Sequence, residues 1–391
     1  MTESLKSLLA QQAAAIAFKP PDLDAIASDR KRLIRRRRAV AVLASVVVVA
    51  AVAATADVLS RPANRSPEVA VPGPVGGVSW AAGTTIHDGD ATIEVGHRVR
   101  AYVRTSVGFV TLDDANNVYS VTGQNVTPIG QAAVPARVDQ DSVRLVSDPR
   151  GTLAGWVGYQ NSVVTLQVHD QATGQTRTYE TNGAKWSGDV AFFAIDGRTA
   201  YWRLATRDGI FAVDLDTGDE RKLASGAQAR DLAIWSVVHG VMAFSRDQRP
   251  FNNATSLSVG RSLDNARDFT FGENAEVDDV IRLSPTGAWV SYLLITFNGP
   301  PVQDDVIGFD TQIRDTVTGE LVTLNLPTPG SFPVVWLEDT TLQVMGFDPA
   351  TGAHMYACSV PDGSCVVAAD LTPAEMDGNN MVWPGGVWIG E

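Results

Sequence analysis

Two interleaved series of turns repeat through most of the 391 residues and constrain the fold more than any other feature. The first series passes through Gly108, Gly151, Gly197, Gly240, Gly287, the Glu338-Asp339 pair and Gly385. The second passes through Gly89, Gly123, Gly174, Gly218, Asp264-Asn265, Gly319 and Gly363. Both are flanked by short apolar or alternating runs, and turns of the first series lie 43 to about 52 residues apart. A repeat of about 40–50 residues made of short strands and turns is typical of a β-propeller.

Each repeat predicts four strands, A to D, with the first turn series between A and B and the second between C and D. Near the start of this region, strands C and D are predicted at Thr84–His87 and Ala91–Val95. Near its end, strands A and B are predicted at Met381–Trp383 and Val387–Ile389. Joined, they would form one blade from both termini, and such closure leaves no exposed edge in the ring. The sequence therefore predicts an all-β propeller over residues 80–391, with seven blades, or six as the alternative.

Aspartate recurs where the second turn begins, at Asp88, Asp170, Asp214 and Asp315. A carboxylate in this position can accept hydrogen bonds from backbone N–H groups further along the turn, while glycine takes the left-handed conformation. We therefore expect these aspartates to be structural. Asp214-x-Asp216-x-Gly218 also matches part of a calcium loop but lacks the distal glutamate.

The blade pattern over residues 80–391 resembles that of the TolB-like and related seven-bladed propellers. Ser147-Asp148-Pro149-Arg150-Gly151 and Ser284-Pro285-Thr286-Gly287 are similar to the Ser-Pro-Asp-Gly turn of that group, although neither matches it in full. The resemblance implies an architecture and no catalytic residues.

The N-terminal region predicts a membrane anchor. Residues 1–38 form a basic tail with helical periodicity and hold nine Lys or Arg against four Asp or Glu. Residues 39–56 are uncharged, and we predict a transmembrane signal-anchor helix over residues 39–60 followed by a Pro-rich linker over residues 61–79. Basic residues before the span place the tail in the cytoplasm of a bacterial-type cell and the propeller outside it. Cleavage after Ala54-Thr55-Ala56, giving a secreted form, is the alternative.

The charge balance indicates which classes of partner the protein can bind. Residues 39–391 carry a net charge of −18, which argues against nucleic acid because phosphate binding needs a basic face. The expected partners are the membrane through residues 39–60, an extracytoplasmic ligand or protein, and a cytoplasmic protein at residues 1–38. A topology signal explains the basic run of the tail, with nucleic-acid binding as the alternative.

The sequence contains a candidate disulfide and no catalytic motif. Cys358 and Cys365 flank a predicted turn, and outside the cytoplasm they are expected to pair, with two buried thiols as the alternative. The five histidines form no HExxH motif, and no G-x-S-x-G sequence occurs. We therefore expect no catalytic residues, no metal, no cofactor and no enzymatic activity. An extracytoplasmic enzyme acting on a carbohydrate or lactone, using acidic pairs such as Asp278-Asp279 or Asp304-Asp305, is the alternative.

Two long loops indicate a binding face. Most predicted connections between strands B and C are short, but Ser245 to Thr255 and Thr296 to Val306 are longer and belong to consecutive repeats. Repeat proteins concentrate insertions on the face that binds. The candidate binding residues are Arg246, Arg249, Phe251, Asn252, Asn253, Phe297, Asn298, Gln303, Asp304 and Asp305. The sequence thus predicts a membrane-anchored module that binds or senses a ligand and could signal through its tail.

Overall fold

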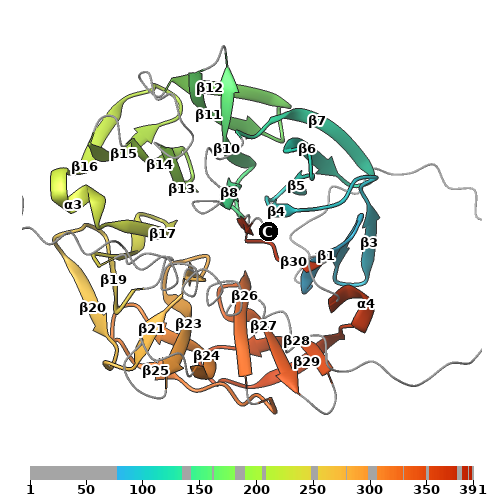
Figure 1. Cartoon of the computed structure of the whole chain (residues 1–391), viewed down its shortest axis with the longest axis vertical. Helices are drawn as coiled ribbons and strands as arrows, with labels where there is room; N and C mark the ends of the chain where they lie inside the picture. Colours follow the sequence, from blue (N-terminus) through green and yellow to red (C-terminus); the bar gives the residue numbers. More distant parts are fainter. Residues whose placement is uncertain are drawn as a thin grey trace, which may run out of the picture. The chain divides into compact units, whose positions relative to one another are not determined.

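A computed structural model shows seven β-sheets arranged as the blades of a propeller (Figure 1). The structure describes residues 77–133, 142–160, 163–180, 190–204, 208–247, 254–278, 280–297, 306–328, 330–348, 352–376, 381–385 and 387–389. The predicted tail, the predicted membrane helix and nearly all of the predicted linker lie outside these residues. Within them, no helix is long and apolar enough to cross a membrane.

Each blade is a meander of antiparallel strands, which are named below from the innermost strand outward. Blade 1 contains β30 (Met381–Val382), β1 (Ser79–Ala82), β2 (Thr85–Asp88) and β3 (Ala91–Glu94). Blade 2 contains β4 (Ala101–Arg104), β5 (Phe109–Leu112), β6 (Asn117–Thr122) and β7 (Asn125–Gln131). Blade 3 contains β9 (Val146–Ser147), β10 (Leu153–Gln160), β11 (Val163–Asp170) and β12 (Gln175–Glu180). Blade 4 contains β13 (Val190–Asp196), β14 (Thr199–Leu204), β15 (Gly209–Asp214) and β16 (Glu220–Ser225).

Blades 5 to 7 follow the same order. Blade 5 contains β17 (Ala233–Val238), β18 (Val241–Ser245), β19 (Ser256–Gly260) and β20 (Ala266–Thr270). In blade 6 the innermost position is shared by β21 (Ala275–Val277) and β22 (Arg282–Leu283), followed by β23 (Trp289–Phe297), β24 (Val306–Asp315) and β25 (Leu321–Val322). Blade 7 contains β26 (Gly330–Glu338), β27 (Thr341–Asp348), β28 (Gly352–Ser359) and β29 (Cys365–Asp370). Two short helices, α3 (Gly226–Arg230) and α4 (Pro373–Met376), lie in connections between blades.

The sequence of each strand follows its place in the blade. Inner strands are covered on both faces by neighbouring blades, so they read as continuous apolar runs such as Ile-Phe-Ala-Val within β15. The outermost strand is largely exposed, and β12 accordingly reads Gln-Thr-Arg-Thr-Tyr-Glu. Burial of the inner strands on both sides is the main stabilising contribution in such a stack, at roughly 25 cal/mol per Å² of apolar surface.

Both termini close the ring, as predicted, but the division of strands differs from the prediction. The C-terminal segment supplies one strand of blade 1, β30, and the N-terminal segment supplies three. Residues 79–82 take the strand B position that was assigned to Val387–Ile389. The register explains the difference, because Ala81 and Ala82 already pair with Val382 and Met381.

The C-terminal strand β31 (Val387–Ile389) leaves blade 1 and pairs with β8 (Ser142–Arg144), which precedes the innermost strand of blade 3. Figure 1 shows this red strand beside β8 near the middle of the ring. One backbone pairing therefore links two blades that are not neighbours, through the interior of the ring.

The predicted role of the turn aspartates is confirmed at three of four positions. The Asp170, Asp214 and Asp315 carboxylates each accept a backbone N–H two residues ahead, at 3.1, 2.8 and 2.7 Å. Asp88 instead accepts two hydrogen bonds from the Arg104 guanidinium of blade 2, at 2.9 and 3.2 Å. Its turn contains only Gly89 and Asp90, so the backbone donors that lie ahead in the longer turns are missing.

Buried polar groups form hydrogen bonds between blades at specific positions. The backbone N–H of Ser79 donates to Oε1 of Gln343, and Nε2 of Gln343 donates to the Ser79 carbonyl, at 2.8 and 2.9 Å. The Ser79 hydroxyl lies 3.1 Å from the hydroxyl of Tyr102. Gln343 is completely buried. One fully satisfied network therefore joins blades 7, 1 and 2 at the place where the ring closes.

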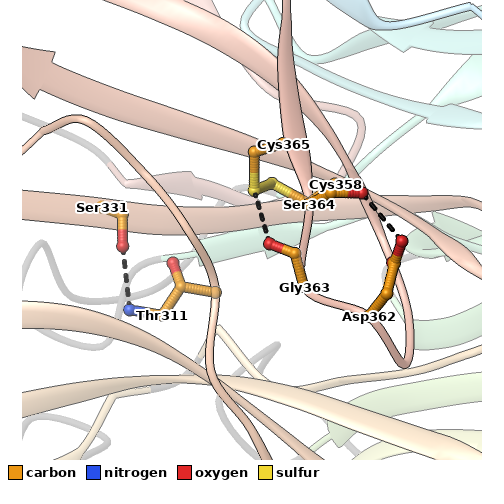
Figure 2. The surroundings of a disulfide bond; sticks show 7 residues. All are labelled: Thr311, Ser331, Cys358, Asp362, Gly363, Ser364 and Cys365. Atoms are coloured by element: carbon orange, nitrogen blue, oxygen red, sulfur yellow. Dashed lines mark hydrogen bonds between the residues drawn. A yellow bond between two sulfur atoms is a disulfide. The ribbon is translucent and has the colours of Figure 1, made fainter.

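The predicted disulfide between Cys358 and Cys365 is present (Figure 2). The two cysteines are directly paired in the register of β28 and β29, with their Cα atoms 4.1 Å apart. The bridge closes the hairpin around Gly363, whose positive φ of 70° suits glycine. It therefore fixes the outermost strand of blade 7 to the strand beside it.

Candidate functional site

The four-strand meander sorts the loops onto two faces of the propeller. Because consecutive strands are antiparallel, A–B and C–D turns lie at one end of each blade, and B–C loops lie at the other. We call these ends the A–B face and the B–C face. The two loops predicted to bind belong to the B–C face.

Hydrogen bonds between the turns of neighbouring blades tie the A–B face together. Asp148 of blade 3 accepts from the backbone N–H of Gly197 in blade 4, at 3.0 Å. Asp196 of blade 4 accepts from His239 and Gly240 in blade 5, at 2.9 and 2.8 Å. These carboxylates satisfy backbone donors of the next turn, which is a structural task.

Two further groups of the A–B face reach between other blades. The Nη1 atom of Arg150 donates to the carbonyl of Pro285, three blades away, at 3.1 Å, and lies 3.3 Å from Nε2 of His239. Asp339 accepts hydrogen bonds from Ser284 and Thr286. Burial opposes ionisation of Asp339, but these hydrogen bonds outweigh it and lower the pKa of the carboxyl group. The groups that the sequence placed in turns are thus engaged with one another.

One pocket opens between blades 3 and 4, with a volume of about 70 Å³, which leaves room for no more than a few water molecules. Arg198 at its wall pairs with Asp216, the residue that the partial calcium motif singled out. The hydroxyl of Tyr179 and the guanidinium of Arg177 both donate to the carbonyl of Leu215, at 2.7 and 2.9 Å. Within the part of the chain that the structure describes, no group of three His, Cys, Asp or Glu side chains is placed to hold a metal ion.

A cluster of partly exposed phenylalanines lies at the B–C ends of blades 6 and 7. Phe309 of β24 stacks on Phe332 of β26, and Phe332 meets Phe347 of β27 edge-on, with 5.5 Å between ring centroids in both pairs. We call these three residues the phenylalanine cluster. Gly330 pairs with Phe347 at the first position of β26, so the cluster lies at the rim of the sheet. Aromatic rings that keep part of their surface exposed are common anchors in recognition sites.

Carboxylates accompany the phenylalanine cluster. Asp310 follows Phe309 and is exposed, and Asp348 follows Phe347 at the end of β27. Asp370 ends β29 and lies 2.7 Å from Nδ1 of His354. Burial and the charges of Asp348 and Asp370 raise the pKa of Tyr356. The rim therefore combines apolar rings with negative charge.

The structure describes two of the ten residues predicted to bind. Phe297 is buried with Leu293 and Ile295, and Phe309 and Phe332 pack against this group. Arg246 donates to Ser258 and Asp268, both at 2.8 Å, and its guanidinium lies 4.9 Å from the ring centre of Phe244. Arg249, Phe251, Asn252, Asn253, Asn298, Gln303, Asp304 and Asp305 lie outside the described residues, so their role stays a prediction.

The phenylalanine cluster itself was missed by the sequence analysis. Phe309, Phe332 and Phe347 occur on three different strands, and their proximity depends on the packing of blade 7 against blade 6. A usable signal was present, since Phe297 and Phe309 lie on either side of the loop that was singled out. Apolar residues at both ends of one long loop indicate a shared apolar rim.

No protein-family model matches the chain, and no curated protein matches it. Solved structures that are similar include TolB from Acinetobacter baumannii, with 13% identity over 74% of this chain and 67% of that chain and a TM-score of 0.36. They also include an oligogalacturonate lyase in complex with manganese, with 12% identity over 68% and 77% and a TM-score of 0.43. A Pyrococcus horikoshii acylaminoacyl peptidase has 10% identity over 73% of this chain and 47% of that chain, with a TM-score of 0.48.

These similarities concern the fold. The architectural resemblance to TolB-like seven-bladed propellers is confirmed, and this chain spans about half the length of the peptidase. The prediction that the protein is not an enzyme is corrected, because similar propellers occur in a lyase and a peptidase as well as in TolB. The prediction failed because a fold does not select between enzymes and binding proteins, whose sites are built on its loops.

Proposed function

We propose that the propeller is a binding module that recognises a partner at the B–C ends of blades 6 and 7. The phenylalanine cluster is the observation that carries this proposal, because three rings in contact keep exposed surface at a rim. On the A–B face, by contrast, Asp148 and Asp196 satisfy backbone donors of the neighbouring turns. Surface that a protein leaves apolar at a rim is typical of an interaction site.

The proposed module is held outside the cytoplasm by residues 39–60, with the basic tail inside. The charge asymmetry around the apolar segment supports this orientation. The disulfide supports an oxidising compartment, since such bonds persist mainly outside the cytoplasm. Binding outside would then be communicated to a cytoplasmic protein through residues 1–38.

Selection from a random peptide library on the purified full chain tests the binding face. Peptides that bind the wild type are measured again on a Phe332→Leu, Phe347→Leu double variant, which keeps an apolar side chain at both positions. We expect the affinity to fall about tenfold or more, because two aromatic contacts are lost. Phe109→Leu in blade 2 is the matched control, since Phe109 begins its strand at the A–B face.

The outcome is decided by comparing the two variants at equal folded fraction, measured by thermal melting. Loss of binding in the double variant with retained binding in the control supports the proposal. Equal binding by the wild type, the double variant and the control would show that the selected peptides bind elsewhere. A library that yields no binders to a folded wild type would also count against the face.

A further inference from the structure

Charge is distributed very unevenly along the propeller. Residues 98–270, which contain blades 2 to 5, have 18 Lys or Arg and 18 Asp or Glu. Residues 271–391, which contain blades 6 and 7, have two Lys or Arg and 17 Asp or Glu. The strands that carry the phenylalanine cluster therefore lie in the acidic part of the ring.

The two basic residues of this acidic part are engaged within the protein. Arg314 donates to the hydroxyl of Tyr292 and the carbonyl of Gly319, at 2.8 and 2.9 Å, and lies 5.4 Å from the ring centre of Phe269. Arg282 donates to the carbonyls of Ile281 and Gly385, at 2.9 and 3.5 Å. With two cations against 17 carboxylates, this part of the ring keeps a large negative charge.

From this combination we propose that the partner of the phenylalanine cluster is a short extended peptide segment in which basic residues alternate with apolar ones. The inference rests on the proposed function and adds the chemistry of the ligand. Apolar side chains would contact Phe309, Phe332 and Phe347, while Lys or Arg would approach Asp310, Asp348 and Asp370. Cations are also attracted to the faces of aromatic rings, which adds to the same preference.

The dimensions of the cluster set the length of the segment. Two centroid spacings of 5.5 Å give a row of rings no longer than about 11 Å. An extended chain rises about 3.3 Å per residue, so roughly three to five residues cover this row. Side chains of alternate residues point the same way, which lets one chain present apolar and basic groups to different parts of the rim.

Other partners fit the charge less well. A second copy of the chain would bring the same acidic surface against itself in a symmetric contact, where like charges repel. Nucleic acid and anionic lipid would be repelled in the same way. A basic peptide is the partner whose charge complements the acidic rim and whose side chains use the rings.

Binding of synthetic peptides to the full chain tests the inference. The probes are labelled, acetylated and amidated pentapeptides, with Lys-Phe-Lys-Phe-Lys as the predicted ligand, Glu-Phe-Glu-Phe-Glu as the charge reversal and Lys-Ser-Lys-Ser-Lys as the apolar deletion. Fluorescence anisotropy at about 50 and 500 mM salt measures the electrostatic part. We expect the first peptide to bind at least tenfold more tightly than either other peptide, and its affinity to fall several-fold at the higher salt.

Two charge variants locate the interaction. The Asp310→Asn, Asp348→Asn, Asp370→Asn variant should weaken the predicted ligand about tenfold. Asp219→Asn, Glu320→Gln, Glu338→Gln removes the same charge from exposed positions of the A–B face and should change affinity less than twofold. Equal effects of the two variants, or tight binding of the glutamate peptide, would overturn the inference.

The outcome also separates this inference from the proposed function. Library peptides that require Phe332 and Phe347 but carry neutral or acidic residues would overturn the basic ligand and leave the binding face supported. Basic peptides that bind without the two rings would count against both.

Discussion

Replacing Gln343 with leucine tests whether its hydrogen bonds to Ser79 stabilise the ring where the ends of the propeller meet. The Gln343 side chain exchanges two hydrogen bonds with the backbone of Ser79, 264 positions away in sequence, and is completely buried. Leucine fills a similar volume but leaves the N–H and the carbonyl of Ser79 without these partners. Each unsatisfied buried group costs roughly 1–3 kcal/mol, so the free energy of unfolding should fall by roughly 2–6 kcal/mol.

Urea denaturation followed by tryptophan fluorescence measures this change. Gln167→Leu is the matched control, because Gln167 is only partly buried and bonds the side chains of Thr165 and Thr178 within its own blade. The control should change stability by about 1 kcal/mol, because the hydrogen bonds that it loses join side chains within one blade and are partly exposed to water. Equal unfolding curves for the two variants would refute the conclusion that the hydrogen bonds of Gln343 stabilise the closed ring.

Four further results are expected. Replacing Cys358 and Cys365 with serine should lower stability by roughly 2–3 kcal/mol, and alkylation of two thiols in the unreduced wild type, seen by intact mass, would contradict the pairing. Deleting residues 381–391 removes β30 and should broaden the melting transition, so an unchanged melt would argue against closure by both termini. Burial lowers the pKa of His97 and His169, so their contribution to the free energy of unfolding is complete above the unfolded value of about 6.5 and is lost as pH falls through the lower folded value. A His97→Asn, His169→Asn variant should therefore lose less stability than the wild type between about pH 7 and 5. An equal loss in the two proteins would contradict this prediction. Protease added to intact cells should digest the propeller and spare residues 1–38, whereas a soluble product beginning at Asp57 would establish cleavage.

The sequence was sufficient to predict the architecture because its period is repeated. Turn residues such as Asp170 and Asp214 make local contacts, and the hairpin that holds the cysteines is local as well. Seven such units with matching patterns left few folds to consider. Closure by both termini could also be predicted, since strands without partners were visible at each end.

The details that depend on distant contacts could not be predicted. The strand Val387–Ile389 was assigned to blade 1, but it pairs with Ser142–Arg144 inside the ring. Its short apolar pattern fits either place, and only the three-dimensional arrangement selects one. Asp88 has the same position in its repeat as Asp170, yet it bonds Arg104 of the next blade because its own turn is shorter.

The candidate site was predicted only to the level of a face. The sequence singled out two long loops on neighbouring repeats, and the phenylalanine cluster lies at the end of one of them. Phe297, which was expected to bind, is instead buried and packs against Phe309 and Phe332. An aromatic residue at a strand end can face the rim or the core, and the alternation of a single strand does not distinguish them.

Hydrogen–deuterium exchange of the full chain, with and without a peptide selected from the library, tests the proposed binding face most directly. We predict slower exchange near the B–C ends of β24, β26 and β27, around Phe309, Phe332 and Phe347, with no change in the turns around Gly151, Gly197 and Gly240. Protection confined to those A–B turns, with unchanged exchange around the phenylalanine cluster, would contradict it.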